Sequence, residues 1–150
     1  MEEHKNMYPT KKQILSSKIK IPPNTIEIVK IWKEYYFTKH NWNKLTKENK
    51  LHNLKILILG LTMITNKKHS VLPIVKDGDS YKYNPLELTI YQDKNKPSII
   101  SALHELAHHL YGKSELTACR WSIAIFKKTF PKEYKKLSWK GHTLIKKTKK

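Results

Sequence analysis

Apolar residues in the first half of the chain recur every three or four positions, which is the spacing of one face of a helix. The first such segment follows a Pro-Pro pair, and Asn24 or Thr25 is expected to cap it. Its expected inner face consists of Ile28, Ile31, Trp32, Tyr35 and Tyr36. The second segment is expected to start near Thr46 and to stop near Asn66. Its expected inner face consists of Leu54, Leu57, Ile58, Leu61 and Ile64. The pattern therefore predicts two amphipathic helices in succession.

In the middle of the chain the pattern shortens to a period of two. Residues 71–75 are a short segment rich in β-branched side chains, and residues 76–79 have the composition of a turn. Residues 81–83 and 86–91 then alternate between the two faces of an expected strand. This region is predicted to form a small antiparallel sheet.

Helical signals return after the sheet. The segment from Pro97 to Tyr111 is strongly apolar and is predicted to be a helix that ends at Gly112. Ser114 can cap a further helix over residues 115–130. The order of elements is therefore helices, a small sheet and two more helices, which indicates an α+β fold.

Length and composition indicate one folded unit. A chain of 150 residues, of which 39% are hydrophobic, can fill one sizeable core. We expect one domain over residues 24–141, a polar N-terminal arm over residues 1–23 and a basic C-terminal tail over residues 142–150. The longest apolar run, residues 56–64, is too short to span a bilayer, and the first residues do not have the pattern of a secretory signal. A cytoplasmic protein without membrane contact is therefore expected.

Cysteine content and charge limit the kinds of site that the chain can carry. The single cysteine, Cys119, excludes an internal disulfide and a zinc site of four cysteines, so a metal would be held by histidine and carboxylate. The net charge of +18 favours contact with DNA, RNA or another polyanion. Ten lysines and one acid, Glu133, follow Phe126, so this contact is expected in the lysine-rich C-terminal region. The alternative interpretation is that the lysines reflect an A/T-rich genome and no selection for binding.

The helix predicted after Pro97 contains the pattern His-Glu-x-x-His. Residues four apart lie on the same side of a helix, so His104 and His108 can both reach one metal ion. Glu105 lies about 100° around the helix from His104, where its carboxylate can reach a water on that ion without binding the ion. Because the ion lowers the pKa of that water, Glu105 can remove its proton at neutral pH.

The surroundings of the pattern support a functional interpretation. Glu105 is the only residue of the Asp, Glu, Lys and Arg class between Ser98 and Leu110. Burial of an unpaired charge costs free energy of folding, so a carboxylate in such an apolar helix is expected to have a functional role. The alternative interpretation is a core helix with incidental histidines.

A catalytic zinc site usually has three protein ligands and one open position, so a third ligand is expected downstream. Gly112 permits a sharp reversal of the chain, after which Glu115 is expected to face the ion. The alternative for Glu115 is an ordinary acid in the first turn of a helix, favoured by the helix dipole. His142 is the alternative third ligand. Cys119 is expected to be structural, and His109 to lie outside the metal sphere.

Residues 101–126 resemble the zinc core of gluzincin-type metallopeptidases, in particular the ImmA/IrrE family. The second motif of that family is Glu-x-x-Ala followed by an aromatic and a small residue. Its counterpart here is Glu115-Leu-Thr-Ala118-Cys-Arg-Trp121-Ser122. The resemblance implies a zincin-like fold in which Ala118 lets the two helices approach closely.

The same resemblance implies a ligand set and a cofactor. Zn2+ would be held by His104, His108 and Glu115. His108 and Glu115 are separated by six residues, and this short separation resembles that of compact SprT-like families. These families are the alternative resemblance to the ImmA/IrrE family.

These features together predict a zinc-dependent metallopeptidase in which Glu105 activates zinc-bound water. The expected substrate is a protein or peptide aligned along the strand at residues 86–91. Tyr111 and Tyr134 are candidates for stabilising an oxyanion. The alternative function is a basic, nucleic-acid-associated zinc protein, either a DNA-linked protease of the SprT type or a non-catalytic binding module.

Overall fold

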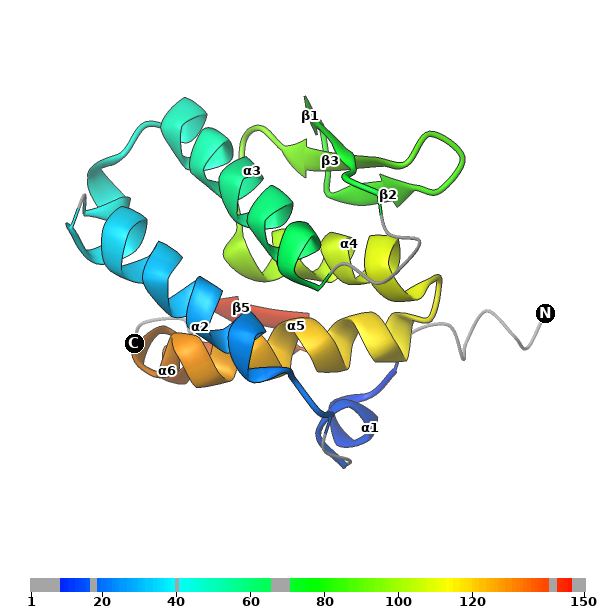
Figure 1. Ribbon diagram of the computed structural model, residues 1–150. Coiled ribbons are helices and arrows are strands. Elements are labelled where there is room, and N and C mark those ends of the chain that lie inside the picture. The colour runs from blue at the N-terminus through cyan, green and yellow to red at the C-terminus, as the bar shows by residue number, and fades with distance from the viewer. Residues whose placement is uncertain (1–8, 17–18, 40, 66–70, 141–142, 147–150) are drawn as a thin grey trace.

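The protein has an α+β architecture in which helix α4 lies between a small sheet and helix α5, and helix α3 lies beside the sheet (Figure 1). The computed structural model describes residues 9–16, 19–39, 41–65, 71–140 and 143–146. The helical elements are α1 (Lys11–Ser16), α2 (Pro23–Trp32), the π-helix η2 (Lys33–Lys39), the 3-10 helix η3 (Trp42–Lys44), α3 (Lys47–Ile64), α4 (Ile99–Tyr111), α5 (Glu115–Thr129) and α6 (Pro131–Lys135). The strands are β1 (Ile74–Gly78), β2 (Lys82–Asn84), β3 (Thr89–Asp93), β4 (Leu137–Lys140) and β5 (Thr143–Lys146). The α+β class predicted from the order of elements is confirmed.

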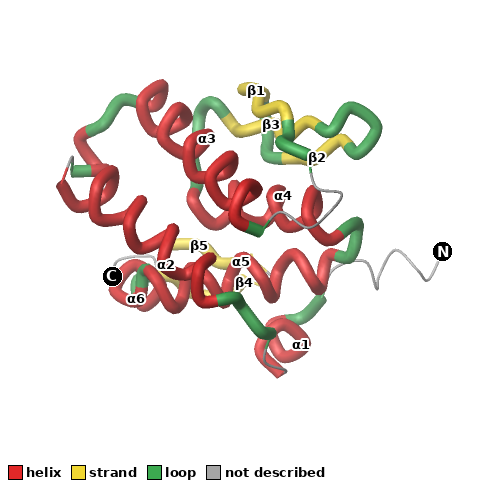
Figure 2. Tube along the Cα trace, viewed as in Figure 1, coloured by secondary structure: helices red, strands yellow, loops and turns green. Residues whose placement is uncertain are grey.

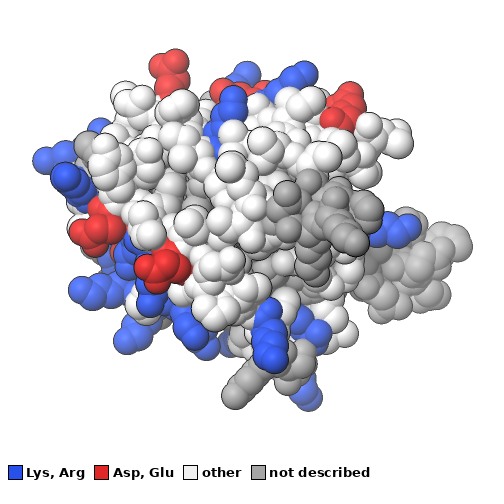
Figure 3. All heavy atoms as spheres, viewed as in Figure 1, with Lys and Arg blue, Asp and Glu red and all other residues white. Residues whose placement is uncertain are grey.

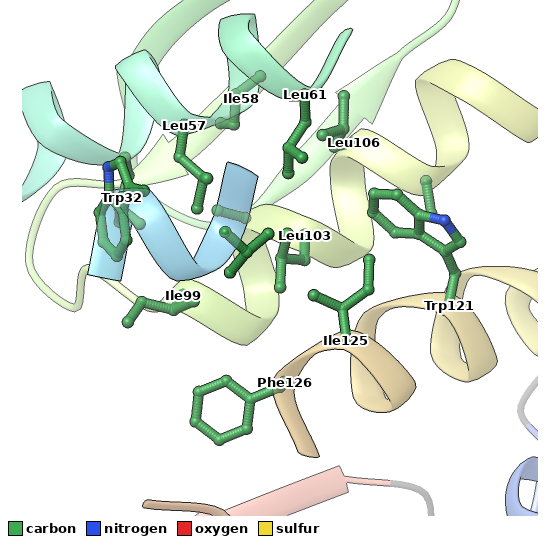
Figure 4. Packing of buried hydrophobic residues seen from close by; sticks show 14 of the residues in the cluster. Trp32, Leu57, Ile58, Leu61, Ile99, Leu103, Leu106, Trp121, Ile125 and Phe126 are labelled. Atoms are coloured by element: carbon green, nitrogen blue, oxygen red, sulfur yellow. The ribbon is translucent and has the colours of Figure 1, made fainter. Parts of the chain in front are cut away.

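The main core lies where α2, α3, α4 and α5 meet, and one side chain from each helix illustrates it. Trp32, Leu57, Leu103 and Ile125 are each buried, and Figure 4 shows them pointing into the same space. The indole Nε1 of Trp32 donates a hydrogen bond of 2.8 Å to the carbonyl oxygen of Asn53, so its polar atom is satisfied inside the core. Burial of each such side chain contributes about 1.5–3 kcal/mol. This packing holds α4 in place.

The first predicted helix is present, but its cap and inner face differ from the expectation. It begins with Pro23 in its first turn and has no side-chain cap, so the predicted cap at Asn24 or Thr25 is wrong. Its buried residues are Thr25, Ile26, Val29 and Trp32. Ile31 and Tyr35, which were expected inside, are exposed. Of the other expected inner residues, Trp32 is buried, and Ile28 and Tyr36 are half-buried against the core, so the predicted face is correct in part. Apolar residues occupy both sides of this helix, and the winding becomes π-helical from Lys33.

The second predicted helix is confirmed as α3. Its cap is Thr46, whose side chain accepts a hydrogen bond of 3.1 Å from the backbone N–H of Asn49. The expected inner residues Leu54, Leu57, Ile58 and Leu61 are buried, and Ile64 is half-buried. Within the described residues, none of the helices has the length and apolar content needed to cross a membrane.

The three-stranded sheet is mixed, so the predicted antiparallel sheet is wrong. Strand β3 lies in the centre, parallel to β1 and antiparallel to β2. The reversal between β2 and β3 is fixed by Asn84, whose Oδ1 accepts hydrogen bonds from the N–H groups of Leu86 and Glu87. The expected turn at residues 76–79 falls largely inside β1 instead. Because β3 is paired on both sides, residues 86–91 do not form the free edge that was expected to bind a peptide; β2 is an edge within the described sheet.

Part of the expected polar arm is folded. Thr10 and Gln13 form a capping box: the Thr10 side chain accepts from the Gln13 N–H at 3.1 Å, and the Gln13 side chain accepts from the Thr10 N–H at 2.8 Å. The helix that follows, α1, buries Ile14 against Cys119 and Ile123 of α5. The pattern Thr-x-x-Gln is visible in the sequence and could have predicted this helix.

The expected basic tail also contains regular structure. Strands β4 and β5 pair antiparallel, with Trp139 opposite Leu144, so the tail predicted over residues 142–150 includes a strand. Figure 2 shows this pair of strands beside α5, away from the three-stranded sheet. His142 lies outside the described residues, so its expected role as the alternative ligand stays a prediction.

The reversal between α4 and α5 depends on Gly112. Its φ of 105° and ψ of −165° fall in a region that side-chain-bearing residues rarely adopt. Ser98 caps α4 and Ser114 caps α5, each accepting a hydrogen bond from the backbone N–H three residues later. Both predicted helices and the predicted stop at Gly112 are confirmed. The reversal therefore sets where the first residue of α5 lies relative to α4.

Two glycine-to-alanine substitutions are expected to change stability in opposite directions. Gly112→Ala should lower the free energy of unfolding by about 1–3 kcal/mol, because alanine does not tolerate this backbone conformation. Gly60→Ala should raise it by about 0.4–1 kcal/mol, because Gly60 is helical and a methyl group there meets no atom within 4 Å. Urea denaturation of the metal-free proteins measures both changes. Equal effects at the two positions would contradict the role given to Gly112.

Candidate metal centre

Helix α4 brings the three motif residues to one place. The ring centres of His104 and His108 are 4.9 Å apart, one helical turn from each other as expected. Both imidazoles are mostly buried, and Glu105 between them in sequence is 9% exposed. The apolar residues of α4 that pack into the core, including Leu103 and Leu106, fix the rotation of the helix and with it the direction of the two rings.

Glu115, the first residue of α5, faces both histidines. One carboxylate oxygen, Oε1, lies 2.9 Å from Nε2 of His104, and the other, Oε2, lies 3.2 Å from Nε2 of His108. The sharp turn at Gly112 and the close packing of α5 on α4 place it there. The structure thus brings together all three residues that were predicted as ligands.

The second nitrogen of His108 is also held. Its Nδ1 lies 2.9 Å from the carbonyl oxygen of Gly112, which can only accept, so Nδ1 carries the hydrogen. In a neutral ring Nε2 would then be an acceptor facing the carboxylate of Glu115 at 3.2 Å. Two acceptors at this distance repel each other unless a cation stands between them, either a second proton on the ring or a metal ion. Two imidazoles and one carboxylate are a donor set that zinc commonly takes, so these residues fit a zinc ion.

Cys119 offers a second possible set of donors. His104, Glu115 and Cys119 present ligand atoms that all lie within 4.8 Å of one another, so this group could hold a metal ion. The Cys119 sulfur is 3.9 Å from Nδ1 of His104, on the other side of the ring from Glu115. Burial, together with the negative charges of Glu115 and Glu105, raises the pKa of the Cys119 thiol to about 12.

We favour the set with His108 over the set with Cys119. A thiol binds metal as the thiolate, so Cys119, which is protonated in the metal-free protein, would have to release a proton on binding. The neutral ring of His108, in contrast, carries its hydrogen on Nδ1 and already presents Nε2 as a ligand atom. Spacing along the helix could not have revealed the position of Cys119, because its approach to His104 depends on how α5 crosses α4.

Glu105 lines the same pocket as His108 and Glu115, and its carboxyl group has a shifted pKa. Its pKa is raised from 4.5 to about 7, mainly by burial; the His108 ring acts in the opposite direction and Glu115 in the same direction as burial. A carboxyl group with a pKa near neutrality can both take up and release a proton at physiological pH. Among the described residues, the ion-pair contacts of the site all involve Glu115, which leaves the Glu105 carboxylate outside the histidine–glutamate cluster.

A pocket of about 380 Å³ opens beside this cluster. Its lining residues are Tyr81, Lys82, Tyr83, Pro85, Glu105, His108, Gly112, Lys113 and Glu115. Three chain segments therefore meet around it: β2 with its flanking residues, α4, and the turn into α5. A ligand in the pocket would contact the edge strand on one side and the candidate metal residues on the other.

Two tyrosines of this pocket were not predicted. Tyr81 is half-buried, its hydroxyl accepts a hydrogen bond of 2.8 Å from the Ser98 N–H, and desolvation raises its pKa. The hydroxyl of Tyr83 lies 2.8 Å from Nδ1 of His109. Tyr111 and Tyr134, which were considered for an oxyanion, do not line the pocket. The alternation at residues 81–83 predicted a strand, but nothing in it indicated that the strand lies against α4.

His109 faces away from the metal residues, as expected. Its Nε2 is 2.6 Å from the carbonyl oxygen of Val71, so Nε2 carries the hydrogen. Nδ1 of a neutral ring then accepts from the hydroxyl of Tyr83. Both ring nitrogens are thus used to fasten β2 and the segment before β1 to helix α4.

Comparison with known proteins adds no family to this geometry. The chain matched no family model, no curated protein and no solved structure.

Proposed function

We propose that this chain is a zinc-dependent peptidase with a site of the zincin type. The observation that carries the proposal is the Glu115 carboxylate, whose two oxygens face Nε2 of His104 and Nε2 of His108. His104, His108 and Glu115 would hold the zinc ion, and the remaining position would be open to water and substrate. Resemblance to the ImmA/IrrE family in sequence supports the same ligands.

The proposed chemistry is hydrolysis of a peptide bond. Zinc, when bound, supplies a Lewis acid that makes water acidic enough to be deprotonated near pH 7 and that polarises the substrate carbonyl. Glu105 takes the proton from the attacking water and delivers it to the leaving amine nitrogen. Its pKa of about 7 before metal is added is compatible with both transfers. The hydrogen bond from His108 Nδ1 to Gly112 keeps Nε2 directed at the ligand position.

The proposed substrate is an extended segment of a protein or peptide. Strand β2 pairs with β3 on one side only within the described sheet, and residues 81–83 line the pocket next to Glu105 and His108. A substrate strand could add to this edge through backbone hydrogen bonds, which place a peptide bond near the site without requiring one sequence. In this proposal β2 takes the part that was first expected of residues 86–91.

Removing the metal is expected to abolish cleavage reversibly. The purified protein is incubated with a peptide library derived from a proteome, and new termini are counted by mass spectrometry. Treatment with 1,10-phenanthroline followed by dialysis should remove cleavage, and one equivalent of zinc per chain should restore it, because the donor set suits zinc. Magnesium prefers oxygen ligands and should not restore it. Cleavage by the metal-free protein would refute the proposal.

A further inference from the structure

Positive charge is distributed unevenly over the molecule. The three-stranded sheet and its turns, residues 74–96, carry four lysines and four acids, so this part is balanced. From Arg120 to the last residue, in contrast, Glu133 is the only acid. Figure 3 shows blue side chains along the lower left and lower edge of the molecule, where α6 and α1 lie in Figure 1; red side chains border them on the left. The stretch with the largest excess of lysine over acid therefore lies away from the sheet.

The basic surface is built from elements that pack around one side of α5. Ile14 of α1, Tyr134 of α6 and Trp139 of β4 all pack against the small cluster formed by Cys119 and Ile123. This packing fixes α1, the end of α5 and α6 relative to one another. We define the basic face by their exposed lysines: Lys11, Lys12, Lys127, Lys128, Lys132, Lys135 and Lys136.

None of the lysines of the basic face forms an ion pair with a carboxylate among the described residues. Within the described ranges, the one lysine–carboxylate ion pair lies away from this face and joins Lys94 to Asp79 beside the sheet. Two lysines instead cover aromatic rings: the Lys127 ammonium is 5.5 Å from the centre of the Tyr134 ring, and that of Lys11 is 6.0 Å from the Trp139 ring. Like charges held this close repel each other, so an anionic partner that runs along the face would be favoured.

We infer that the basic face binds the phosphate backbone of double-stranded DNA without reading its sequence. Lysine ammonium groups act as point charges toward phosphates, whereas reading of guanine is done mainly by the fork of arginine, and Arg120 is already bonded to the carbonyl oxygen of Gln13. Single strands are bound by stacking bases on open aromatic rings, and here Tyr134 and Trp139 are half-buried beneath lysines. Duplex RNA is recognised partly through its 2′-hydroxyls, for which ammonium groups, which only donate, are a poorer match. This inference does not depend on the proposed peptidase activity.

Fluorescence anisotropy of the full-length protein with a short labelled DNA duplex tests the inference. If about five of these lysines each neutralise a phosphate, the logarithm of the affinity should fall with the logarithm of salt concentration with a slope of about −4 to −5. Two unrelated duplex sequences should bind equally well. A single strand, an RNA duplex and phosphatidylserine vesicles, tested in the same buffer, should bind more weakly.

A matched pair of triple variants separates the basic face from net charge. Lys128→Gln with Lys132→Gln and Lys135→Gln should weaken DNA binding at least about tenfold and reduce the slope by about 2–3. Lys76→Gln with Lys94→Gln and Lys96→Gln removes the same charge from exposed sites around the sheet and should change the affinity less than about twofold. Circular dichroism checks that both variants fold. Equal losses in the two variants, or tighter binding to vesicles, RNA or a single strand, would overturn the inference.

Discussion

Glu105→Gln is expected to abolish peptide cleavage while leaving one zinc ion bound to each chain. Glutamine has nearly the same shape as glutamate but cannot take a proton from water, so the rate should fall by about 10³-fold or more. The zinc ligands proposed for the site are His104, His108 and Glu115, and none of them is altered. The variant should therefore contain as much zinc as the unaltered protein. Cleavage of the peptide library and zinc analysis of the same preparation measure the two quantities.

Glu115→Gln is the matched control, because it makes the same chemical change about 3 Å from both histidines. It replaces an anionic ligand by a neutral amide, so it should lose zinc as well as activity. The pair of variants thus separates proton transfer from metal binding. Cleavage retained by Glu105→Gln with full zinc content would remove Glu105 from the mechanism. Loss of zinc in Glu105→Gln would show that this carboxylate helps to hold the metal.

The parts of the fold that the sequence predicted well are those marked by strong local signals. Ser98 and Ser114 each accept a hydrogen bond from a backbone N–H in the first turn of their helix, and Gly112 ends α4. These signals are local, so the positions of α4 and α5 could be predicted without knowledge of the packing. The His-Glu-x-x-His spacing works in the same way, because a helix alone puts both rings on one side. These features depend on residues within one or two turns of each other.

Features that depend on long-range packing were harder to predict. The inner stripe of α2 is chosen by contact with α3, including the bond from Trp32 to Asn53, and the sequence offers apolar residues on both sides of the helix. The strand order in the sheet is likewise set by which edges meet, since β3 enters between β1 and β2. At the site, long-range packing also brings Cys119 close to His104 and places Tyr81 and Tyr83 in the pocket. Residue spacing carries no information about such crossings.

His108→Ala is expected to remove zinc, whereas His109→Ala, the neighbouring substitution, should retain it. Nε2 of His108 lies 3.2 Å from Glu115, in the proposed ligand set, so its loss should lower zinc affinity by more than about 100-fold. The ring of His109 bonds to Tyr83 and to the carbonyl oxygen of Val71, so its loss should affect stability more than zinc. Zinc affinity is measured by competition with a chromophoric chelator after dialysis against metal-free buffer. Equal zinc loss in both variants would indicate general damage to α4.

Cys119→Ala completes this test, because it distinguishes the two possible sets of ligands. If zinc is held by His104, His108 and Glu115, this variant should keep one zinc ion, weakened by no more than about tenfold through the lost contact with the His104 ring. If zinc is instead held by His104, Glu115 and Cys119, the same variant should lose zinc and His108→Ala should keep it. Cobalt substitution adds a direct readout, since a bound thiolate gives an intense sulfur-to-cobalt absorption band in the near ultraviolet and an unbound thiol does not. We expect no such band, because burial and two carboxylates hold the thiol in its protonated form.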